Sequence, residues 1–141
     1  MNTDRVGIYT QIVALFANTD IKYFYPIEKP ISLTANAKKQ GFMVIRAGNI
    51  DDNSEFSENA YAEMRIQLEM YIPTKSNGIV DGSLFSKYQS LIDTTIKEAV
   101  NNEDSGLNII PDDMLNADDF DNSNADNPFS IYIKSFLILI N

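Results

Sequence analysis

The clearest pattern in the chain is an alternation of apolar and polar residues over residues 60–72, AYAEMRIQLEMYI. The apolar row is Met64, Ile66, Leu68, Met70 and Ile72, and the other row is Glu63, Arg65, Gln67, Glu69 and Tyr71. Because successive side chains of a strand point to opposite faces, the alternation predicts a strand with one buried face and one solvated or interfacial face. Pro73 should end this strand, since proline cannot donate to a strand ladder.

Two other stretches have the spacing of amphipathic helices. Apolar residues recur every three or four positions in residues 4–18, and again in residues 83–100, where Asp81 or Ser83 can cap the N-terminus. The apolar side of the first helix is wider than a single contact requires. We therefore expect it to be wedged between the sheet and a neighbour, and its pattern leaves open whether it also makes a subunit contact.

Three further segments are predicted as strands. Residues 21–27 and 41–47 are short and rich in β-formers, and Pro26 places the first at an edge or a terminus. Residues 128–141 form a longer strand whose second half is apolar on both faces, which is typical of a strand covered on both sides. The polar residues 34–41 and 48–59 between these segments are predicted as loops.

The order helix-strand-strand-strand-helix-strand predicts an α+β fold in one domain, residues 1–141. We expect one mixed, mostly antiparallel four-stranded sheet with two main helices packed on it. The first three strands can pair as a meander. The last returns after the second helix and is inserted centrally or alongside them.

Composition removes several classes of chemistry. The 141 residues include no cysteine and no histidine, which excludes disulfides, thiolate or histidine metal ligands and histidine-based nucleophilic catalysis. The six glycines form no phosphate-binding motif, and the carboxylates have no evident pocket, so we expect no enzyme, cofactor or metal site. The longest apolar run, Phe136–Ile140, is far too short to span a membrane, so no membrane association is expected.

The net charge of −9 is concentrated in one segment. Residues 101–128 hold eight acidic residues and no Lys or Arg, which leaves the other residues close to neutral, with 12 acids against 11 bases. Since no basic patch is evident along the chain, sequence-specific binding of nucleic acid is not expected. Residues 101–127 are predicted as an acidic, mobile loop, in which Leu107, Ile109 and Ile110 can pair briefly as a strand.

The stretch DDFDNSNADNP, residues 118–128, has some features of a calcium loop. Starting at Asp119, carboxylate or hydroxyl oxygens stand at template positions 1, 3 and 5, but position 12 is Ser130 where the template requires a bidentate Glu. A strand pattern also follows where the exiting helix should begin. An EF-hand is therefore not expected, and a weak cation site or a solvated loop ordered by a partner remain as alternatives.

At the level of its elements, the chain resembles the tail terminator (tail completion) proteins of long-tailed bacteriophages, the lambda-type tail terminator family. The likeness rests on the opening helix RVGIYTQIVALF, the strand GFMVIRA, the unit AEMRIQLEMYIPT followed by the helix LFSKYQSLIDTTIKEAV, and the terminal strand FSIYIKSFLILIN.

The resemblance implies a structural protein of the virion tail, assembled in the host cytoplasm. Copies of the chain would form a homo-oligomeric ring, a hexamer, that caps the tail tube and docks the neck or head connector. By the same analogy the 48–59 loop would contact the tube or a neighbour, with Ile50 and Phe56 as apolar anchors. Together with residues of the alternating strand, the predicted partner or oligomer contact residues are Ile50, Phe56, Tyr61, Glu63, Arg65 and Glu69. A related contractile injection particle, a head-closure or neck protein, and a stand-alone α+β protein-binding module are the alternatives.

Overall fold

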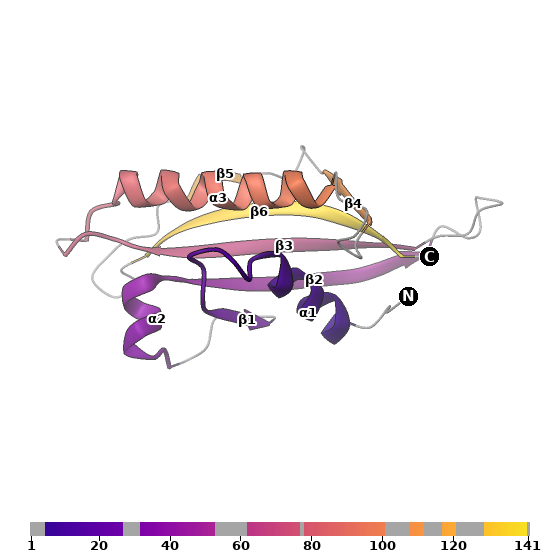
Figure 1. The fold of residues 1–141 in the computed structure, drawn as a ribbon, viewed down its shortest axis with the longest axis horizontal. Helices are drawn as coiled ribbons and strands as arrows, with labels where there is room; N and C mark the ends of the chain where they lie inside the picture. Colours follow the sequence, from indigo (N-terminus) through magenta and orange to yellow (C-terminus); the bar gives the residue numbers. More distant parts are fainter. Residues whose placement is uncertain are drawn as a thin grey trace.

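The computed structural model describes residues 5–26, 32–52, 62–76, 78–100, 108–111, 117–120 and 129–140. Their elements are α1 (Arg5–Leu15), β1 (Phe24–Pro26), α2 (Ala35–Gln40), β2 (Phe42–Asp52), β3 (Ala62–Pro73), α3 (Gly82–Val100), β4 (Asn108–Pro111), β5 (Ala117–Phe120) and β6 (Phe129–Ile140) (Figure 1). The two predicted helices are α1 and α3, and the four predicted strands are β1, β2, β3 and β6.

These strands form one mixed, mostly antiparallel sheet, which confirms the predicted α+β fold. The strand order is β1-β2-β3-β6-β4, and the short β5 also pairs with β6. Strand β6 runs antiparallel to β3 over twelve residue pairs and is followed on its other side by β4 and β5. The last described strand is therefore inserted within the sheet and not added at its edge.

The predicted meander is wrong at its first step, because β1 runs parallel to β2. Parallel neighbours need a crossover connection, and α2 lies in that connection, in a segment predicted to be a loop. The side chain of Thr34 caps the helix by accepting a hydrogen bond from the N–H of Ala37, and Ala37 is the residue of α2 that is buried.

Gly41 makes the passage from α2 into β2 possible. It ends the helix with φ of +86°, a conformation that favours glycine, and its N–H donates to the carbonyl oxygen of Ala37. A β-carbon at this position would lie 2.6 Å from the carbonyl oxygen of Tyr71. The close approach brings the last turn of α2 against the end of β3.

Strand β2 is longer than predicted, and it includes part of the predicted loop 48–59. Its pairing with β3 continues to Asp52, with a register shift between Ala47 and Ile50. Such a shift is a β-bulge, which bends the strand locally without ending the pairing. Residues 48–52 are therefore strand, and residues 53–59 lie outside the described part of the chain.

Helices α1 and α3 cover one face of the sheet (Figure 1). The apolar row predicted for β3 faces them and is fully buried, together with side chains from β2, β6 and both helices. From α1 and the turn after it this core receives Ile8, Ile12 and Phe16, and from α3 it receives Phe85, Tyr88, Ile92, Ile96 and Ala99. Burial of this apolar area is the main stabilising contribution to the fold.

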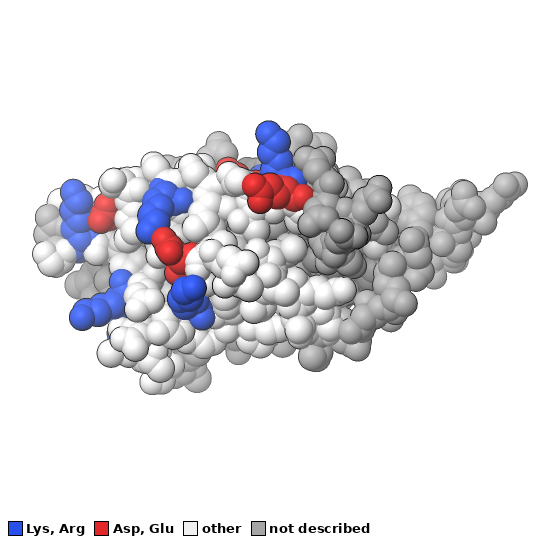
Figure 2. Space-filling model, viewed as in Figure 1, with Lys and Arg blue, Asp and Glu red and all other residues white. Residues whose placement is uncertain are grey.

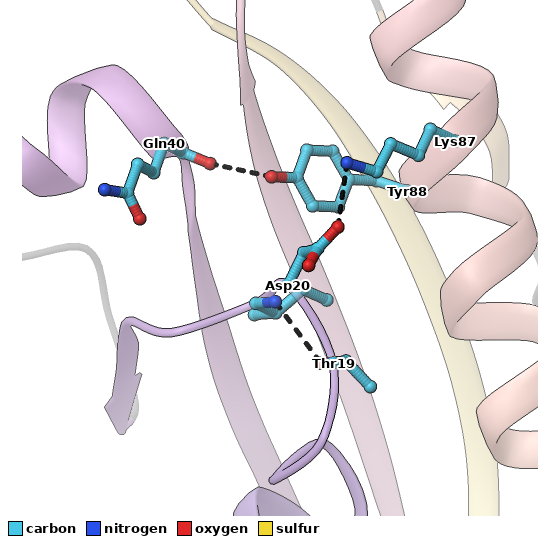
Figure 3. A network of polar contacts seen from close by, with 6 residues as sticks. Thr19, Asp20, Gln40, Lys87 and Tyr88 are labelled. Atoms are coloured by element: carbon cyan, nitrogen blue, oxygen red, sulfur yellow. Dashed lines mark hydrogen bonds and ion pairs between the residues drawn. The ribbon is translucent and has the colours of Figure 1, made fainter.

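Polar contacts join the segments at the rim of this helix layer (Figure 3). The Tyr88 hydroxyl donates to the carbonyl oxygen of Gln40 at 3.0 Å, which links α3 to the end of α2. Lys87 Nζ lies 2.8 Å from Asp20 Oδ2, which links α3 to the segment after α1. These contacts connect three elements that are far apart in the sequence.

A second polar contact joins α3 to β6. The Tyr132 hydroxyl donates to Asp93, and Lys134 Nζ lies 3.5 Å from the same carboxylate oxygen. Lys134 is therefore accommodated on the helix-covered face by a specific counter-charge. Within the described ranges, no helix has both the length and the apolar character needed to cross a bilayer.

Candidate interaction surface on the outer face of the sheet

Three of the six predicted contact residues lie on the sheet face opposite the helices, which we call the outer face. Glu63, Arg65 and Glu69 occupy alternate positions of β3 on this face, and Arg65 is exposed while Glu63 is half-buried. Glu69 differs from the other two, because only 9% of it is exposed. The row predicted to be solvated is therefore open to solvent at Glu63 and Arg65 and buried at Glu69.

For the other three predicted residues, the described structure shows no side chain on this face. Ile50 lies in β2 opposite Met64, not in a loop, and its side chain is outside the described part. Phe56 and Tyr61 lie outside the described residues altogether.

Glu69 is held by two polar neighbours. Arg46 Nε lies 3.0 Å from Glu69 Oε1, and Gln67 Nε2 donates to Glu69 Oε2 at 2.8 Å. The Arg46 contact is a charge contact without good hydrogen-bond direction, since Oε1 has no hydrogen-bond partner in the described structure. In the sheet, Glu69 lies between two apolar side chains, Val44 on β2 and Ile133 on β6, which accounts for its burial.

A cluster of aromatic side chains adjoins this ion pair on the outer face. The Phe42 ring stacks on Tyr71 with centroids 4.6 Å apart, and Phe129 meets Phe42 edge to face at 5.3 Å. Tyr25 of the edge strand β1 also packs edge to face on Phe42. Phe42, Val44, Tyr71, Phe129 and Ile131 together form a second buried apolar cluster, separate from the core under the helices.

Tyr71 belongs to both parts of this surface. Its ring stacks in the aromatic cluster, while its hydroxyl interacts with Glu69 and Arg46. Burial and the negative charge of Glu69 raise the pKa of Tyr71 above its ordinary value, and the nearby Arg46 charge opposes this rise only in part. Tyr71 is therefore a neutral hydrogen-bonding group at physiological pH.

The outer face combines a buried aromatic cluster with charged side chains that are partly exposed. Across the ranges that the structure describes, no three Asp, Glu, His or Cys side chains are grouped as metal ligands. The carboxylate of Glu69 is engaged by Arg46 and Gln67. Aromatic rings beside an arginine in a partly desolvated setting are typical of protein–protein interfaces.

Two members of this surface, Arg46 and Phe42, were not among the predicted contact residues. A signal for both was present in GFMVIRA, where Phe42, Val44 and Arg46 occupy alternate positions and would share one face of a strand. To predict that Arg46 contacts Glu69, one must know the register of β2 against β3. The pattern of a single strand does not give that register.

The fold and this surface define an α+β protein whose single sheet has one helix-covered face and one face of mixed aromatic and charged character. Comparisons with protein-family models, with curated proteins and with solved structures found no match to the chain.

Proposed function

We propose that this protein is a structural assembly protein of a phage tail or of a related contractile injection particle. In this role it forms a homo-oligomeric ring that caps the tail tube and docks the neck or head connector. The proposal assigns it a place in the virion tail and no catalytic residue, cofactor or metal. It rests on the order of elements in the sequence and on the character of the outer face.

The observation that carries the proposal is the difference between the two faces of the sheet. One face is closed by α1 and α3, whereas the outer face carries Arg46, Arg65 and Glu63 at its polar end. The side chain of Arg46 remains 41% exposed although its Nε contacts Glu69. Because the buried carboxylate already orders the Arg46 side chain, binding of a partner to it would cost little further side-chain entropy.

The long β2–β3 hairpin also suits assembly. Its strands pair up to Asp52 and Ala62, so the backbone positions of Ile50 and Glu63 lie at the end of the sheet away from α2. Regular strands position contact groups more rigidly than loops do. A neck or head-closure protein would use the same features against a different partner.

The direct experiment is to polymerise the tail tube protein of the same particle with and without this protein, and to measure tube length by electron microscopy. We expect added protein to stop elongation and to form a ring at one tube end. The mass of the isolated protein, measured by light scattering over a range of concentrations, should show a hexamer or its precursors. A strict monomer that never binds tube subunits would contradict the proposal and favour the stand-alone binding module.

A matched pair of variants tests the assigned face. Arg65→Glu reverses an exposed charge on the outer face, and Lys97→Glu reverses a charge on α3. If the outer face binds a copy or the tube, Arg65→Glu should weaken tube capping several-fold while Lys97→Glu leaves it unchanged. Equal behaviour of the two variants would remove the outer face from the proposal.

A further inference from the structure

Exposed lysine side chains from four segments that are far apart in the sequence gather at the α2 end of the sheet. Two of them are in the last turn of α2, one is in the turn after β3, one is in the first half of α3 and one follows α1. We call this set the basic surface, and its members are Lys22, Lys38, Lys39, Lys75 and Lys87. In Figure 2 the basic side chains on the visible face lie mainly over the half that contains α2 and the start of α3.

Contacts between the four segments bring these lysines together. The Tyr88 hydroxyl donates to the carbonyl oxygen of Gln40, so the second turn of α3 lies beside the end of α2 (Figure 3). A β-carbon on Gly41 would lie 3.1 Å from Pro73 Cδ, so the end of β3 also lies beside the end of α2. The lysines of α2, of the turn after β3 and of α3 therefore share one end of the molecule.

The acidic side chains of the same segments do not neutralise the basic surface. The hydrogen bond and charge of Lys87, and then the charge of Lys22, lower the pKa of Asp20, which places both lysines near one carboxylate. Asp81 accepts a hydrogen bond from the N–H of Leu84 at the start of α3. Five lysines and two aspartates occur in the described parts of residues 19–26, 32–41 and 73–90. The surface therefore remains positive, although the net charge of the chain is −9.

An apolar side chain is exposed beside the basic surface. Ile79 is 59% exposed. Its turn is held by two hydrogen bonds, from Lys75 N–H to the carbonyl oxygen of Ile79 and from Gly78 N–H to the carbonyl oxygen of Lys75. A single exposed isoleucine is ordinary on a protein surface. Held in a hydrogen-bonded turn beside a group of lysines, however, it gives the surface an apolar anchor with a charged rim.

We propose that the basic surface docks on an acidic surface of a different protein, with Ile79 entering an apolar recess of that partner. This inference rests on the proposed function, because it names the chemistry of one of the proteins that the ring docks. Complementary charge speeds the encounter and selects the partner, while the apolar contact slows dissociation. The exposed lysines suit this role because few of them are already engaged by carboxylates of their own segments.

A protein fits this surface better than a nucleic acid does. A phosphate backbone supplies negative charge but no apolar recess for Ile79. The charges of the basic surface are all lysines, which lack the bidentate guanidinium used to read bases. The Tyr88 ring beside Lys87 is buried, so it is not free to stack on a base. The apolar anchor is therefore the feature that distinguishes the two kinds of partner.

Two synthetic acidic polymers separate the charge contact from the apolar contact. Poly-glutamate offers carboxylates alone, and a glutamate–tyrosine copolymer of the same length adds aromatic side chains that can pack on Ile79. Fluorescence anisotropy with the full-length protein should show tighter binding of the copolymer than of poly-glutamate. Binding of both should weaken as salt is raised. Duplex DNA of equal charge is the third probe and should bind several-fold more weakly than the copolymer.

Charge and anchor variants of the exposed residues test each part of the surface. Lys38→Glu combined with Lys39→Glu should weaken binding of both polymers about tenfold, and Lys39→Glu alone about threefold. Ile79→Ser should abolish the preference for the copolymer and leave poly-glutamate binding unchanged. Each variant should melt at the wild-type temperature, since the altered side chains are exposed.

Lys97→Glu is the matched control for Lys39→Glu. Lys97 is exposed in the last turn of α3. It lies about 22 Å along the helix from Gly82 at 1.5 Å per residue, well beyond the screening length of about 8 Å at physiological ionic strength. The same change of net charge at this position should leave polymer binding unchanged.

Three outcomes would overturn the inference. Equal losses in Lys39→Glu and Lys97→Glu, or no loss in either, would show that the basic surface is not the docking site. Unchanged copolymer binding by Ile79→Ser would remove the apolar anchor. Duplex DNA that binds as tightly as the copolymer, and is lost in the Lys38→Glu, Lys39→Glu variant, would make a nucleic acid the occupant.

Purified tube and neck proteins of the same particle connect the surface to assembly. At least one of them should bind the Lys38→Glu, Lys39→Glu variant about tenfold more weakly than the wild type, and no loss with either protein would contradict the inference. The proposed function fails by a different result. Wild-type protein that binds the copolymer as expected but never caps tubes would keep the docking surface and remove the proposed function.

Discussion

The two faces of the sheet are stabilised by different means. Under α1 and α3 the side chains of β3 are apolar and fully buried, and polar contacts lie at the rim. On the outer face the same strand carries Glu63, Arg65, Gln67 and Glu69, and burial there involves an ion pair beside an aromatic cluster. A single strand therefore contributes to a continuous core on one side and to a partly polar surface on the other.

The two faces of the sheet contribute differently to stability and to specificity. Apolar burial under the helices contributes stability in proportion to area and needs little directional precision. A buried carboxylate contributes little net stability, because its desolvation offsets most of the attraction to its partner. We infer that Glu69 positions the Arg46 side chain on the outer face.

The largest expected effect distinguishes neighbouring residues of β6 that point to opposite faces. Phe136 is fully buried under the helices, whereas Leu137 is half-buried on the outer face. Phe136→Ala should lower the free energy of unfolding by about 3–5 kcal/mol, and Leu137→Ala by about 1 kcal/mol. Urea denaturation measures both, and similar losses would show that the two faces are equally closed.

A smaller effect is expected at the ion pair. Arg46→Met leaves Glu69 buried without its counter-charge and should cost about 1–2 kcal/mol, less than a fully buried pair because Arg46 is partly exposed. Adding Glu69→Leu removes the isolated charge and should restore most of this loss. Arg65→Met, at an exposed site on the same face, serves as the control. If the double variant is no more stable than Arg46→Met, Glu69 is not the source of the cost.

The smallest effect is expected at the rim of the helix layer. The hydrogen bond and charge of Lys87 lower the pKa of Asp20, and those of Asp20 raise the pKa of Lys87. The stability from this pair is present above the ordinary aspartate pKa, lost as pH falls through the lowered pKa, and lost again as pH rises through the raised lysine pKa.

Asp20→Asn should therefore lower the melting temperature only slightly at neutral pH. The difference from the wild type should disappear below the lowered pKa of Asp20 and in high salt, since both groups are exposed. Differential scanning fluorimetry across pH and salt is sufficient. A difference that persists in high salt would show that Asp20 acts through something other than this exposed pair.

Periodicity was sufficient to predict the long elements. The alternation in β3 and the helical spacing of α3 extend over many residues, so they identify both the element and its buried side. The apolar character of β6 identified the strand, but its second half is not covered on both faces as predicted, because Leu137 and Leu139 are only half-buried on the outer face. The α+β class and the mixed sheet follow from the order of these elements. The polar row of β3 also placed Glu63 and Arg65 on the outer face, whereas Glu69 in the same row is buried.

The remaining features depend on neighbours that are distant in sequence. ANAKKQ has no apolar periodicity, and one buried alanine is too weak a signal to reveal α2 or the parallel β1–β2 pair it allows. Glu69 is buried because Val44 and Ile133 flank it across two strands, and no local pattern contains that arrangement. These features depend on how the strands are paired and in which register, which the propensities of single segments do not determine.

The position of β6 has a consequence for how the chain acquires its fold during synthesis. Strand β6 is made after every strand with which it pairs, yet it lies between β3 and the β4–β5 side of the sheet. Until it emerges, β3 presents an open edge and β4 and β5 have no described partner strand. Non-local pairing of this kind slows folding and leaves apolar edges exposed meanwhile. Nascent chains halted before β6 should therefore depend on chaperones, and completion of β6 should be the step that commits the sheet to its native topology.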